Sequence, residues 1–558
     1  MELIITENTR KASTIQAALG EGCVVKACPA PRGDAAALAD LIASARQAET
    51  ITLATDPDRE GESLAHDIVE ALPGRARARA RRVIFSQLSG DAIREALSQP
   101  RAIDGDQADA HRARKAITRL AGARVACLLE RWGLNGGPTP ELSLSGLAAL
   151  RLVVEREWAR RDATPQRRWT IAAELTHDGV RFRAEMANAE GIDTGEEACR
   201  VVEQLRLPGT TWLVEGITGR MEREAPPPPF TTGTLLGEAW RGLRFRPDRT
   251  QQAARALYET GLITYPHTRS SQVSPAARAL ARLVIADLYG QEGLPEGSSQ
   301  DETNSVKDGI EAIRPTDPTL TPAHSGEALR RRGLDGDAVR LYGLIWRRFI
   351  ASQMRPAAYA VVEATIRPHW WGSVEPWEEP ELHPHPDPFE ARWELALADG
   401  HRRVTRGTSD EAVPRELAAL GEGVVVDVHE LEARQHTGEE PPHFSPAGLA
   451  QALEAAGAGR PSDYAPAVEA LLASGYIALD GDWLVPTRRG EDALYASLSQ
   501  FPRLFEPAFM AEMEALLERV AAGEATARQA VEVFERAVPA LQLPPRLMRA
   551  PRLHKEAV

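Results

Sequence analysis

Cysteine, lysine and long apolar runs are scarce in this chain of 558 residues, and each scarcity narrows what the protein can be. The four cysteines stand apart without a CxxC pair, which argues against a disulfide scaffold and against a zinc ribbon. No apolar run approaches the roughly 18 residues that a membrane span needs. The chain begins with a short apolar strand pattern and a charge at Glu7, so we expect no secretory signal. We therefore expect a cytoplasmic protein without a membrane partner.

Lysine is so rare that almost all positive charge is carried by arginine; it occurs only at Lys11, Lys26, Lys115, Lys307 and Lys555. None of these lysines follows a glycine, so the Gly-Lys-Ser/Thr sequence of a P-loop is absent and an ATP-driven mechanism is not expected. Where arginine is the rule, a lysine at position 11 suggests that a compact ammonium is needed there.

The balance of charge is acidic, with a formal net charge of −14 at pH 7. Such a net charge argues against a general nucleic-acid binder. Two dense basic stretches nevertheless occur at 74–85 and 111–124. These stretches are either solvated faces or phosphate contacts, and both interpretations stay open. The length predicts several domains, and 43% apolar residues with 5% aromatics are typical of a folded globular protein.

The first hundred residues alternate between strand and helix patterns. Apolar strands are predicted at 3–5, at 51–55 and at the start of 81–98, and each precedes an amphipathic helix. This alternation predicts a parallel sheet, and ligands bind beyond the carboxyl ends of such strands. Four acids follow those predicted strand ends, namely Glu7, Asp56, Asp58 and Glu60.

Several carboxylates in one place repel one another unless a cation joins them. Oxygen ligands of this kind suit Mg²⁺, which binds a few carboxylates and keeps several waters. An exposed acidic turn is the alternative for "DPDRE" alone, but a second acid on a neighbouring strand end favours the metal site. This strand–Glu…DxDxE arrangement resembles the Toprim fold of type IA and type II topoisomerases, bacterial primases and some nucleases.

Motifs along the rest of the chain select among these proteins. In order and character they resemble those of type IA DNA topoisomerases, from the first strand to about residue 540. The motifs are "ITENTRKASTI" (5–15), "LATDPDREGE" (53–62), "LRLVVERE" (150–157), "PFTTGTLL" (229–236), "RALYETGLITYPHTRS" (255–270), "EAIRPTD" (311–317), "LYGLIWRRFIASQM" (341–354), "HFSPAGLAQALEAAGAGRPSDYA" (443–465) and "LLASGYI" (471–477).

The resemblance implies an α/β plus α+β multidomain fold, in which an N-terminal Toprim α/β domain is followed by a toroidal helical gate and a β-rich arch. The implied boundaries are 1–100 for the Toprim domain, 101–160 and 443–540 for the gate, 161–229 and 355–442 for the arch, 230–354 for the domain that carries a nucleophilic tyrosine, and 541–558 for a flexible basic tail. Arch strands are expected within 359–368 and 423–433, whereas the proline-rich insert 370–393 reads as a loop.

The resemblance also implies a chemistry. Tyr265, on a predicted strand, would attack a backbone phosphate of single-stranded DNA and keep the 5′-phosphate, with Glu7 and Lys11 assisting. Mg²⁺ would be held by Glu7, Asp56, Asp58 and Glu60, without ATP or zinc. A monomer associated with the nucleoid would then relax negatively supercoiled DNA, and its substrate would be single-stranded segments of negatively supercoiled or catenated DNA. The candidate DNA contacts are Arg59, Arg114, His267, Arg269, Arg314 and Arg460. Arg59, Arg114, Arg314 and Arg460 could equally form structural salt bridges, since arginine is common in this chain.

The sequence departs from the family pattern around the nucleophile. Tyr-x-Arg-Thr-Asp becomes Tyr265-Pro266-His267-Thr268-Arg269, and on an extended chain Arg269 would share a face with Tyr265 and could replace the lost guanidinium. Ile310 stands where the family has an active-site histidine. The Gly-His-x-x-Asp loop is reduced to "ACPAPRGD" (27–34), and the Gly-Arg-Val-Gln stretch appears within "SLSGLAALRLVVERE" (143–157).

Other functions remain to be weighed against a working topoisomerase. A catalytically impaired paralogue would use the same ring as a clamp on single-stranded DNA, and Tyr265 would then be an ordinary core aromatic, as most of the eight tyrosines are. A Toprim nuclease would need no tyrosine, but the ordered motifs after residue 220 argue against it. Retention of Tyr265, Glu7, Lys11 and the acidic set favours an active or weakly active enzyme.

Overall fold

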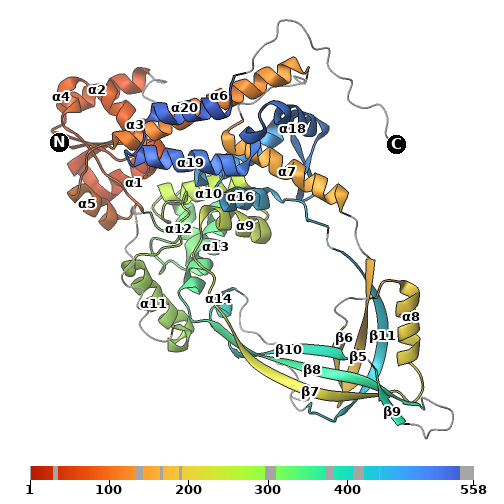
Figure 1. The fold of residues 1–558 in the computed structure, drawn as a ribbon. Coiled ribbons are helices and arrows are strands. Elements are labelled where there is room, and N and C mark those ends of the chain that lie inside the picture. Colours follow the sequence, from red (N-terminus) through yellow and green to blue (C-terminus); the bar gives the residue numbers. More distant parts are fainter. Residues whose placement is uncertain are drawn as a thin grey trace.

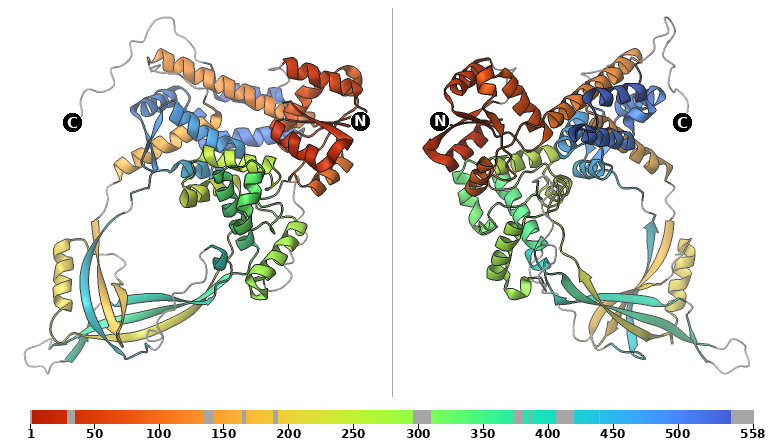
Figure 2. Two further views of the ribbon diagram at one scale, coloured as in Figure 1. Left: turned by 180° about the vertical axis from the view of Figure 1, so that it is seen from behind. Right: turned by 60° about the vertical axis from the view of Figure 1, so that its left-hand side comes forward.

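The protein is described by a computed structural model in which a helical body and a β-rich arch together form a ring (Figure 1). Both views in Figure 2 show the same opening between the body and the arch. The structure describes residues 2–28, 35–133, 142–163, 167–187, 192–295, 310–372, 381–385, 387–405, 420–438 and 440–540. Within these ranges, no helix has the length and apolar character required to span a membrane. The predicted tail 541–558 and residues 29–34 of the reduced loop lie outside them.

The N-terminal domain is built on a parallel sheet, as the strand–helix alternation predicts. Its four strands lie in the order β2-β1-β3-β4, and each neighbouring pair is parallel. Leu3 and Ile5 pack on one face and Ile4 on the other, because successive side chains of a strand point to opposite faces. The strands are β1 (Glu2–Thr6), β2 (Cys23–Ala27), β3 (Thr50–Leu53) and β4 (Ala80–Arg82).

The helices of this domain cover both faces of the sheet. They are α1 (Thr9–Leu19), α2 (Ala35–Gln47), α3 (Arg59–Ala71), α4 (Gly74–Arg77) and α5 (Gly90–Ser98). Polar side chains start three of them: Asn8, Asp58 and Ser89 each accept a hydrogen bond from a backbone N–H in the first turn of the following helix. Two of these caps directly adjoin acids of the predicted site, so capping fixes the direction in which those acids leave the strands.

The region around Tyr265 shares a hydrophobic core with the N-terminal domain. Ile4, Val83 and Phe85 belong to the same cluster of buried residues as Tyr258 and Tyr265. The two units therefore do not pack as separate bodies at this face. The helices of the second unit are α9 (Thr232–Leu243), α10 (Pro247–Glu259), α11 (Pro275–Tyr289), α12 (Pro322–Arg331) and α13 (Gly336–Ser352).

The predicted strand at Tyr265 is wrong, because this segment makes only isolated bridges. Ile263 pairs with Pro315, and Phe230 pairs with Ile313. Between them the side chain of Thr264 interrupts the ladder: its hydroxyl donates to the carbonyl of Ala312 at 2.6 Å and accepts from the N–H of Arg314 at 2.9 Å. A side chain that takes the place of a backbone group competes with regular pairing.

The gate region is helical apart from one hairpin. The long helix α6 contacts α3 of the N-terminal domain as well as α19 and α20, and Figure 1 shows these helices side by side. The elements are α6 (Gly105–Arg131), α7 (Leu144–Asp162), α16 (Pro446–Ala455), α17 (Tyr464–Ala473), β12 (Ile477–Asp480), β13 (Trp483–Pro486), α18 (Arg488–Gln500), α19 (Pro507–Ala521) and α20 (Ala527–Ala537).

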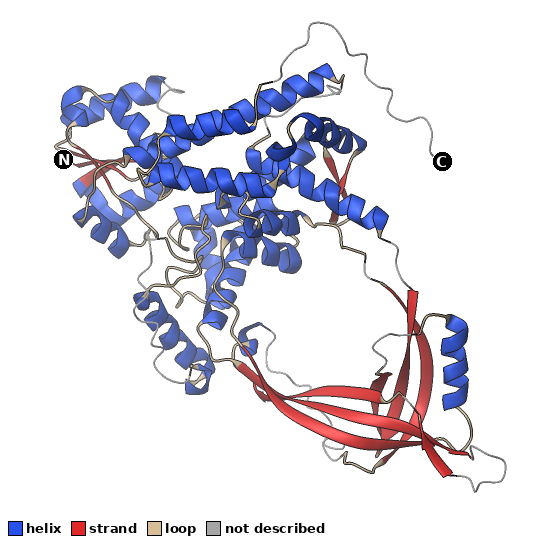
Figure 3. Cartoon of the chain, in the orientation of Figure 1, coloured by secondary structure: helices blue, strands red, loops and turns tan. Residues whose placement is uncertain are grey.

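The arch is an antiparallel sheet that closes on itself, since β10 pairs with both β6 and β8. Figure 3 shows that strands dominate this half of the ring, with α8 (Gly195–Leu205) beside them. The strands are β5 (Arg167–His177), β6 (Val180–Met186), β7 (Thr211–Glu224), β8 (Ala357–Gly372), β9 (Glu381–Pro384), β10 (Phe389–Ala398) and β11 (Val425–Thr437); the short helix α14 (Arg402–Thr405) follows β10.

The loop predicted for the insert 370–393 is wrong in part. β8 extends to Gly372, β9 pairs with it from His369 to Gly372, and β10 begins at Phe389. β9 lies at the end of the sheet order, and an edge strand tolerates the prolines and acids that argued against a strand core. Residues 373–380 lie outside the described ranges.

Candidate active site

Two neighbouring strand ends meet at Lys11. Glu7 follows β1, Asp56 follows β3, and the buried ammonium of Lys11 donates to both carboxylates, at 2.9 Å and 2.8 Å respectively. The Asn8 cap begins α1 immediately after Glu7, so Glu7 and Lys11 lie one helical turn apart on the same side. The lysine that stands out in the sequence thus holds the first two acids together.

The acidic turn after β3 is held by its own residues. The Asp58 carboxylate caps α3 by accepting from the N–H of Gly61 at 2.8 Å. The hydroxyl of Thr55 donates to the carbonyl of Gly61 at 2.6 Å. A Cβ atom at position 61 would lie 2.2 Å from the carbonyl oxygen of Asp56, so only glycine allows the turn to close this tightly.

A buried ion pair behind this turn was missed by sequence reasoning. Arg82 is completely buried; it donates to Glu62 at 2.9 Å, to the Asp56 carbonyl at 2.6 Å and to the Thr55 carbonyl at 3.0 Å. Its guanidinium therefore holds the backbone that presents Asp56. The signal was an arginine inside a predicted apolar strand, "RRVIF", where a charge has to find partners.

Tyr265 reaches this acidic turn from the other unit. Its hydroxyl donates to Asp58 at 2.6 Å, and its backbone N–H donates to the carbonyl of Ser86 at 2.9 Å. The ring packs edge-on against Tyr258 and His267, with centroid distances of 5.3 Å and 5.4 Å. Burial and the charge of Asp58 raise the pKa of Tyr265 well above its ordinary value. The side chain is thus held in place and protonated.

Two cavities flank the contact between Tyr265 and Asp58. A cavity of about 570 Å³, here called the nucleophile cavity, is lined by Glu7, Asp56, Asp58, Glu60, Tyr265 and His267 among others. A second cavity of about 780 Å³, here called the arginine cavity, shares Asp58, Glu60 and His267 with the first. Its other lining residues include Arg59, Arg101, Arg114, Arg269, Ile310 and Arg460.

The two acids bonded to Lys11 differ in their protonation. Desolvation raises the pKa of Glu7 to about 7, although Lys11 acts against it. Desolvation also opposes ionisation of Asp56, but the charge of Lys11 and the hydrogen bonds from Glu7 and Lys11 together outweigh it and lower the pKa of Asp56 to about 2. One carboxylate and one ammonium therefore stay charged, while Glu7 exchanges a proton near neutral pH.

The acidic residues suit a hard cation. Glu7 Oε2 is buried and has no hydrogen-bond partner, which leaves a carboxylate oxygen free for another group. Desolvation and the charge of Asp58 raise the pKa of Glu60, as expected for acids crowded without a counter-ion. A set of oxygen donors in one cavity matches the preference of Mg²⁺.

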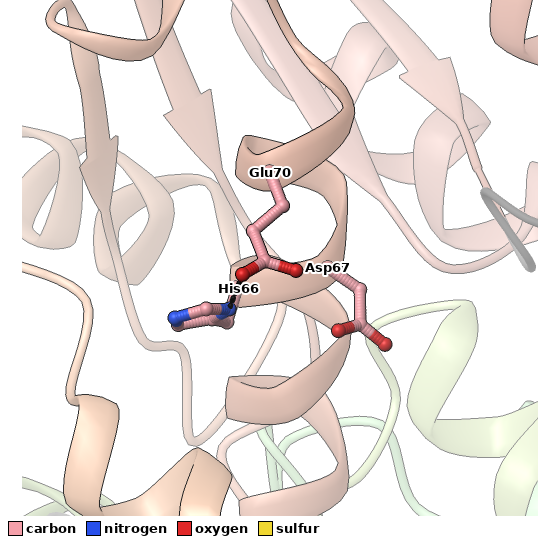
Figure 4. A group of neighbouring side chains, drawn as sticks. All are labelled: His66, Asp67 and Glu70. Atoms are coloured by element: carbon pink, nitrogen blue, oxygen red, sulfur yellow. Dashed lines mark ion pairs between the residues drawn. The ribbon is translucent and has the colours of Figure 1, made fainter.

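A different group of side chains lies closer together but does not suit a metal. Among the described residues, His66, Asp67 and Glu70 are the only ones that bring three candidate ligand atoms within 4.8 Å of one another (Figure 4). The guanidinium of Arg112 already occupies two of these ligand atoms, because it contacts His66 Nδ1 at 2.8 Å and Asp67 at 2.9 Å. The group is better explained as an ion-pair network between α3 and α6.

Three of the predicted DNA contacts are tied to acids across the arginine cavity. Arg59 donates to Glu518 and, at 2.9 Å, to Gln107. Arg114 contacts Asp463 and, at 3.1 Å, Glu514, whereas Arg460 lies 3.3 Å from Glu514. Glu514 and Glu518 belong to α19. In this arrangement the acids of α19 pair with the arginines that the resemblance assigns to phosphate.

The other three predicted DNA contacts, Arg269, Arg314 and His267, lie in different environments. Arg269 donates to the hydroxyl of Tyr464 at 3.0 Å and lines only the arginine cavity, so the structure gives no support to its replacing a guanidinium beside Tyr265. Arg314 is buried and bonded to Glu311 at 2.7 Å and 2.9 Å. His267 lines both cavities, and burial lowers its pKa.

Comparison with known proteins agrees with this fold. Residues 2–88 match the Toprim domain, and residues 102–532 match the family described as DNA topoisomerase. The chain is similar in structure to full-length topoisomerase I from Thermotoga maritima, with a TM-score of 0.80 and 27% sequence identity over 96% of this chain and 89% of that chain. The Toprim domain is a metal-binding fold. The chain therefore belongs to the type IA DNA topoisomerase family, with a Toprim domain at its N-terminus.

Proposed function

We propose that this protein breaks and rejoins one DNA strand through a 5′-phosphotyrosyl intermediate at Tyr265, without ATP and with Mg²⁺. The observation that carries the proposal is the 2.6 Å hydrogen bond between Tyr265 and Asp58, at the wall of a cavity that Glu7, Asp56 and Glu60 also line. This hydrogen bond brings together residues more than two hundred positions apart in the sequence. Relaxation of negatively supercoiled DNA by a monomer is the activity we assign.

The side chains divide the steps of cleavage between them. Asp58 orients the Tyr265 hydroxyl and offers an acceptor for its proton as the Tyr265 oxygen bonds to phosphorus. The bond from phosphorus to the 3′-oxygen of the preceding nucleotide breaks, and Glu7 protonates that oxygen. A pKa of about 7 suits Glu7 to this exchange in both directions, because an effective acid–base group titrates near the working pH.

Charge on the transferring phosphoryl group needs stabilisation as well. Lys11 keeps its proton between Glu7 and Asp56, because these carboxylates outweigh the desolvation that would lower its pKa. Mg²⁺ held by Glu7, Asp56, Asp58 and Glu60 would supply Lewis-acid stabilisation of the phosphate oxygens. The phosphotyrosyl ester conserves the energy of the broken bond, so rejoining requires no nucleotide.

The first test compares the wild-type protein with Tyr265→Phe on negatively supercoiled plasmid in the presence of Mg²⁺. We expect relaxation and denaturant-trapped protein–DNA adducts with the wild type only, since the substitution removes the nucleophilic oxygen and little else. Chelation of the metal should abolish relaxation by the wild type. Binding of single-stranded DNA by both proteins serves as the control for folding.

The result also decides between this proposal and its alternatives. A protein that binds single-stranded DNA, forms no adduct and is indifferent to Tyr265→Phe would act as a clamp. Cleavage that persists in Tyr265→Phe would indicate attack by water, as in a nuclease. No observation in the structure favours either alternative over the Tyr265 chemistry.

A further inference from the structure

The nucleophile cavity is strongly acidic for a place that would receive a phosphodiester. Its lining includes six carboxylates, from Glu7, Asp56, Asp58, Glu60, Asp248 and Glu469. Among the described residues that line it, Arg255 is the only arginine or lysine. Even with a divalent cation bound, an anionic strand in such surroundings requires a positive group at the wall.

Arg255 lies on α10 and is held in place from one side only. Its Nε donates to Glu259 at 2.8 Å. Glu259 in turn accepts from Asn8 Nδ2 at 3.0 Å, next to Glu7 and at the start of α1. The Arg255 side chain is 57% exposed, and its two terminal nitrogens have no partner among the described residues. The guanidinium is therefore anchored through Nε, while its phosphate-binding edge stays open.

The other cations near Tyr265 are engaged elsewhere. Lys11 is fully buried between Glu7 and Asp56 and does not line the cavity. Arg269 is directed to Tyr464 and Gly459 in the gate region.

We propose that Arg255 is a catalytic residue that binds the phosphate attacked by Tyr265, through the two terminal nitrogens that the protein leaves unpaired. This inference rests on the proposed function. His267 and Arg269 do not place a positive charge beside Tyr265. Arg255, which lies on α10 ten residues before Tyr265, would supply that charge instead. Glu259 is then a positioning residue, which ties the guanidinium to the turn that carries Glu7.

The test measures single-turnover cleavage of a labelled single-stranded oligonucleotide by trapping the covalent adduct. Arg255→Met keeps the length of the side chain and removes its charge, and we expect a loss in cleavage rate of about 10²-fold. Arg255→Lys should recover part of that loss. Arg249→Met is the matched control, because Arg249 is an arginine of α10 with 50% exposure that is also paired with one carboxylate, Asp337, but outside the cavity. Thermal unfolding of all three variants verifies folding.

A second readout separates phosphate contact from an indirect effect through Glu259. An oligonucleotide with a neutral methylphosphonate at the cleavage position should be cleaved at similar rates by the wild type and Arg255→Met, since the charge that Arg255 binds is missing. In a Tyr265→Phe background, Arg255→Met should also reduce the salt dependence of single-strand binding by about 0.7 in log–log slope.

The outcomes distinguish this inference from the proposed function. Wild-type adducts accompanied by unchanged cleavage in Arg255→Met would overturn the role of Arg255 and leave the Tyr265 chemistry intact. A loss in Arg255→Met that persists with the methylphosphonate would assign the residue to structure. Absence of any Tyr265-dependent adduct in the wild type would overturn both.

Discussion

At the scale of single residues, arginine has several separate uses in this protein. Arg82 and Arg314 are buried and hydrogen-bonded to acids and to backbone carbonyls. Arg114 pairs with acids across the arginine cavity, whereas Arg255 keeps two nitrogens open. The planar guanidinium, with five donors, serves each of these uses. Its role is set by which carboxylates the fold places around it.

The buried pair of Arg82 and Glu62 predicts a large effect on stability. Arg82→Met leaves Glu62 buried with one charged partner fewer, and breaking a buried pair in this way costs about 3–5 kcal/mol. We expect this decrease in the free energy of unfolding, together with weaker Mg²⁺ binding, because the Asp56 carbonyl loses its donor. Urea unfolding and metal titration measure the two effects. Adding Glu62→Gln should restore part of the stability, and equal loss in the single and double variants would contradict the pairing.

At the scale of elements, the segment around 311–315 supports the backbone that precedes Tyr265. Ile313 bridges to Phe230, and Thr264 receives the N–H of Arg314 one residue before Tyr265. Glu311 accepts from Arg314 and from the backbone N–H of Ser274 at 3.0 Å. This internal pair fixes an irregular segment where strand pairing is lost. In this structure, Arg314 therefore stabilises the segment that holds the backbone next to Tyr265.

This element carries a pH-dependent contribution to stability. Burial opposes ionisation of Glu311 and is the largest single influence, but the hydrogen bond and charge of Arg314 and the hydrogen bonds from Ser274 together outweigh it and lower the carboxyl pKa below its ordinary value of 4.5. Because the carboxyl pKa is lower in the folded state, Glu311 adds to the free energy of unfolding. This contribution has its full size above the unfolded-state pKa and is lost as the pH falls through the folded-state pKa. Glu311→Gln should therefore be destabilised at pH 7 by about 1.5–3 kcal/mol and by much less near pH 3.

Urea unfolding at a series of pH values measures this difference between Glu311→Gln and the wild type. Glu327→Gln is the control, because Glu327 forms a surface pair with Arg331 in which both side chains are 75% exposed. Such a pair contributes about 0–1 kcal/mol, so this variant should follow the wild type. A difference for Glu311→Gln that does not change with pH would contradict the assignment.

At the scale of the whole molecule, ion pairs that line the arginine cavity join the N-terminal domain to the gate region. Arg59 of α3 reaches Glu518 of α19, and Arg114 of α6 reaches Glu514 of the same helix. The N-terminal domain is also joined to the Tyr265 region, through the hydrophobic core that the two share. A strand that enters the arginine cavity has to compete with the α19 carboxylates for the same guanidinium groups.

Removing those carboxylates should strengthen DNA binding. We expect the double variant Glu514→Gln, Glu518→Gln to bind single-stranded DNA more tightly, with a log–log salt slope steeper by about 0.7 for each arginine that becomes available. Fluorescence anisotropy of a labelled oligonucleotide measures both quantities. Glu512→Gln is the control on the same helix, because Glu512 is 62% exposed and pairs with Arg503. Unchanged affinity in the double variant would show that α19 does not compete with DNA.

The sequence by itself was sufficient to predict the parallel N-terminal sheet and the acids at its strand ends, because apolar periodicity defines the elements and parallel strands place their carboxyl ends at one edge. The β-rich arch and the family were predicted from the resemblance of the ordered motifs. Lys11 could be singled out because its residue type is rare. Local pattern failed at Tyr265, where the Thr264 hydroxyl replaces strand pairing, and at 370–393, where an edge position admits proline.

Only the tertiary structure decided what each charged side chain does. Arg82, Arg255 and Arg269 share one residue type, yet the first is buried beneath the acidic turn, the second faces the nucleophile cavity and the third is bonded to the gate. The pKa of about 7 at Glu7 likewise depends on desolvation and on Asp56, which stands far along the chain. Electrostatic energies depend on distance and burial in space, and neither quantity is contained in the order of residues.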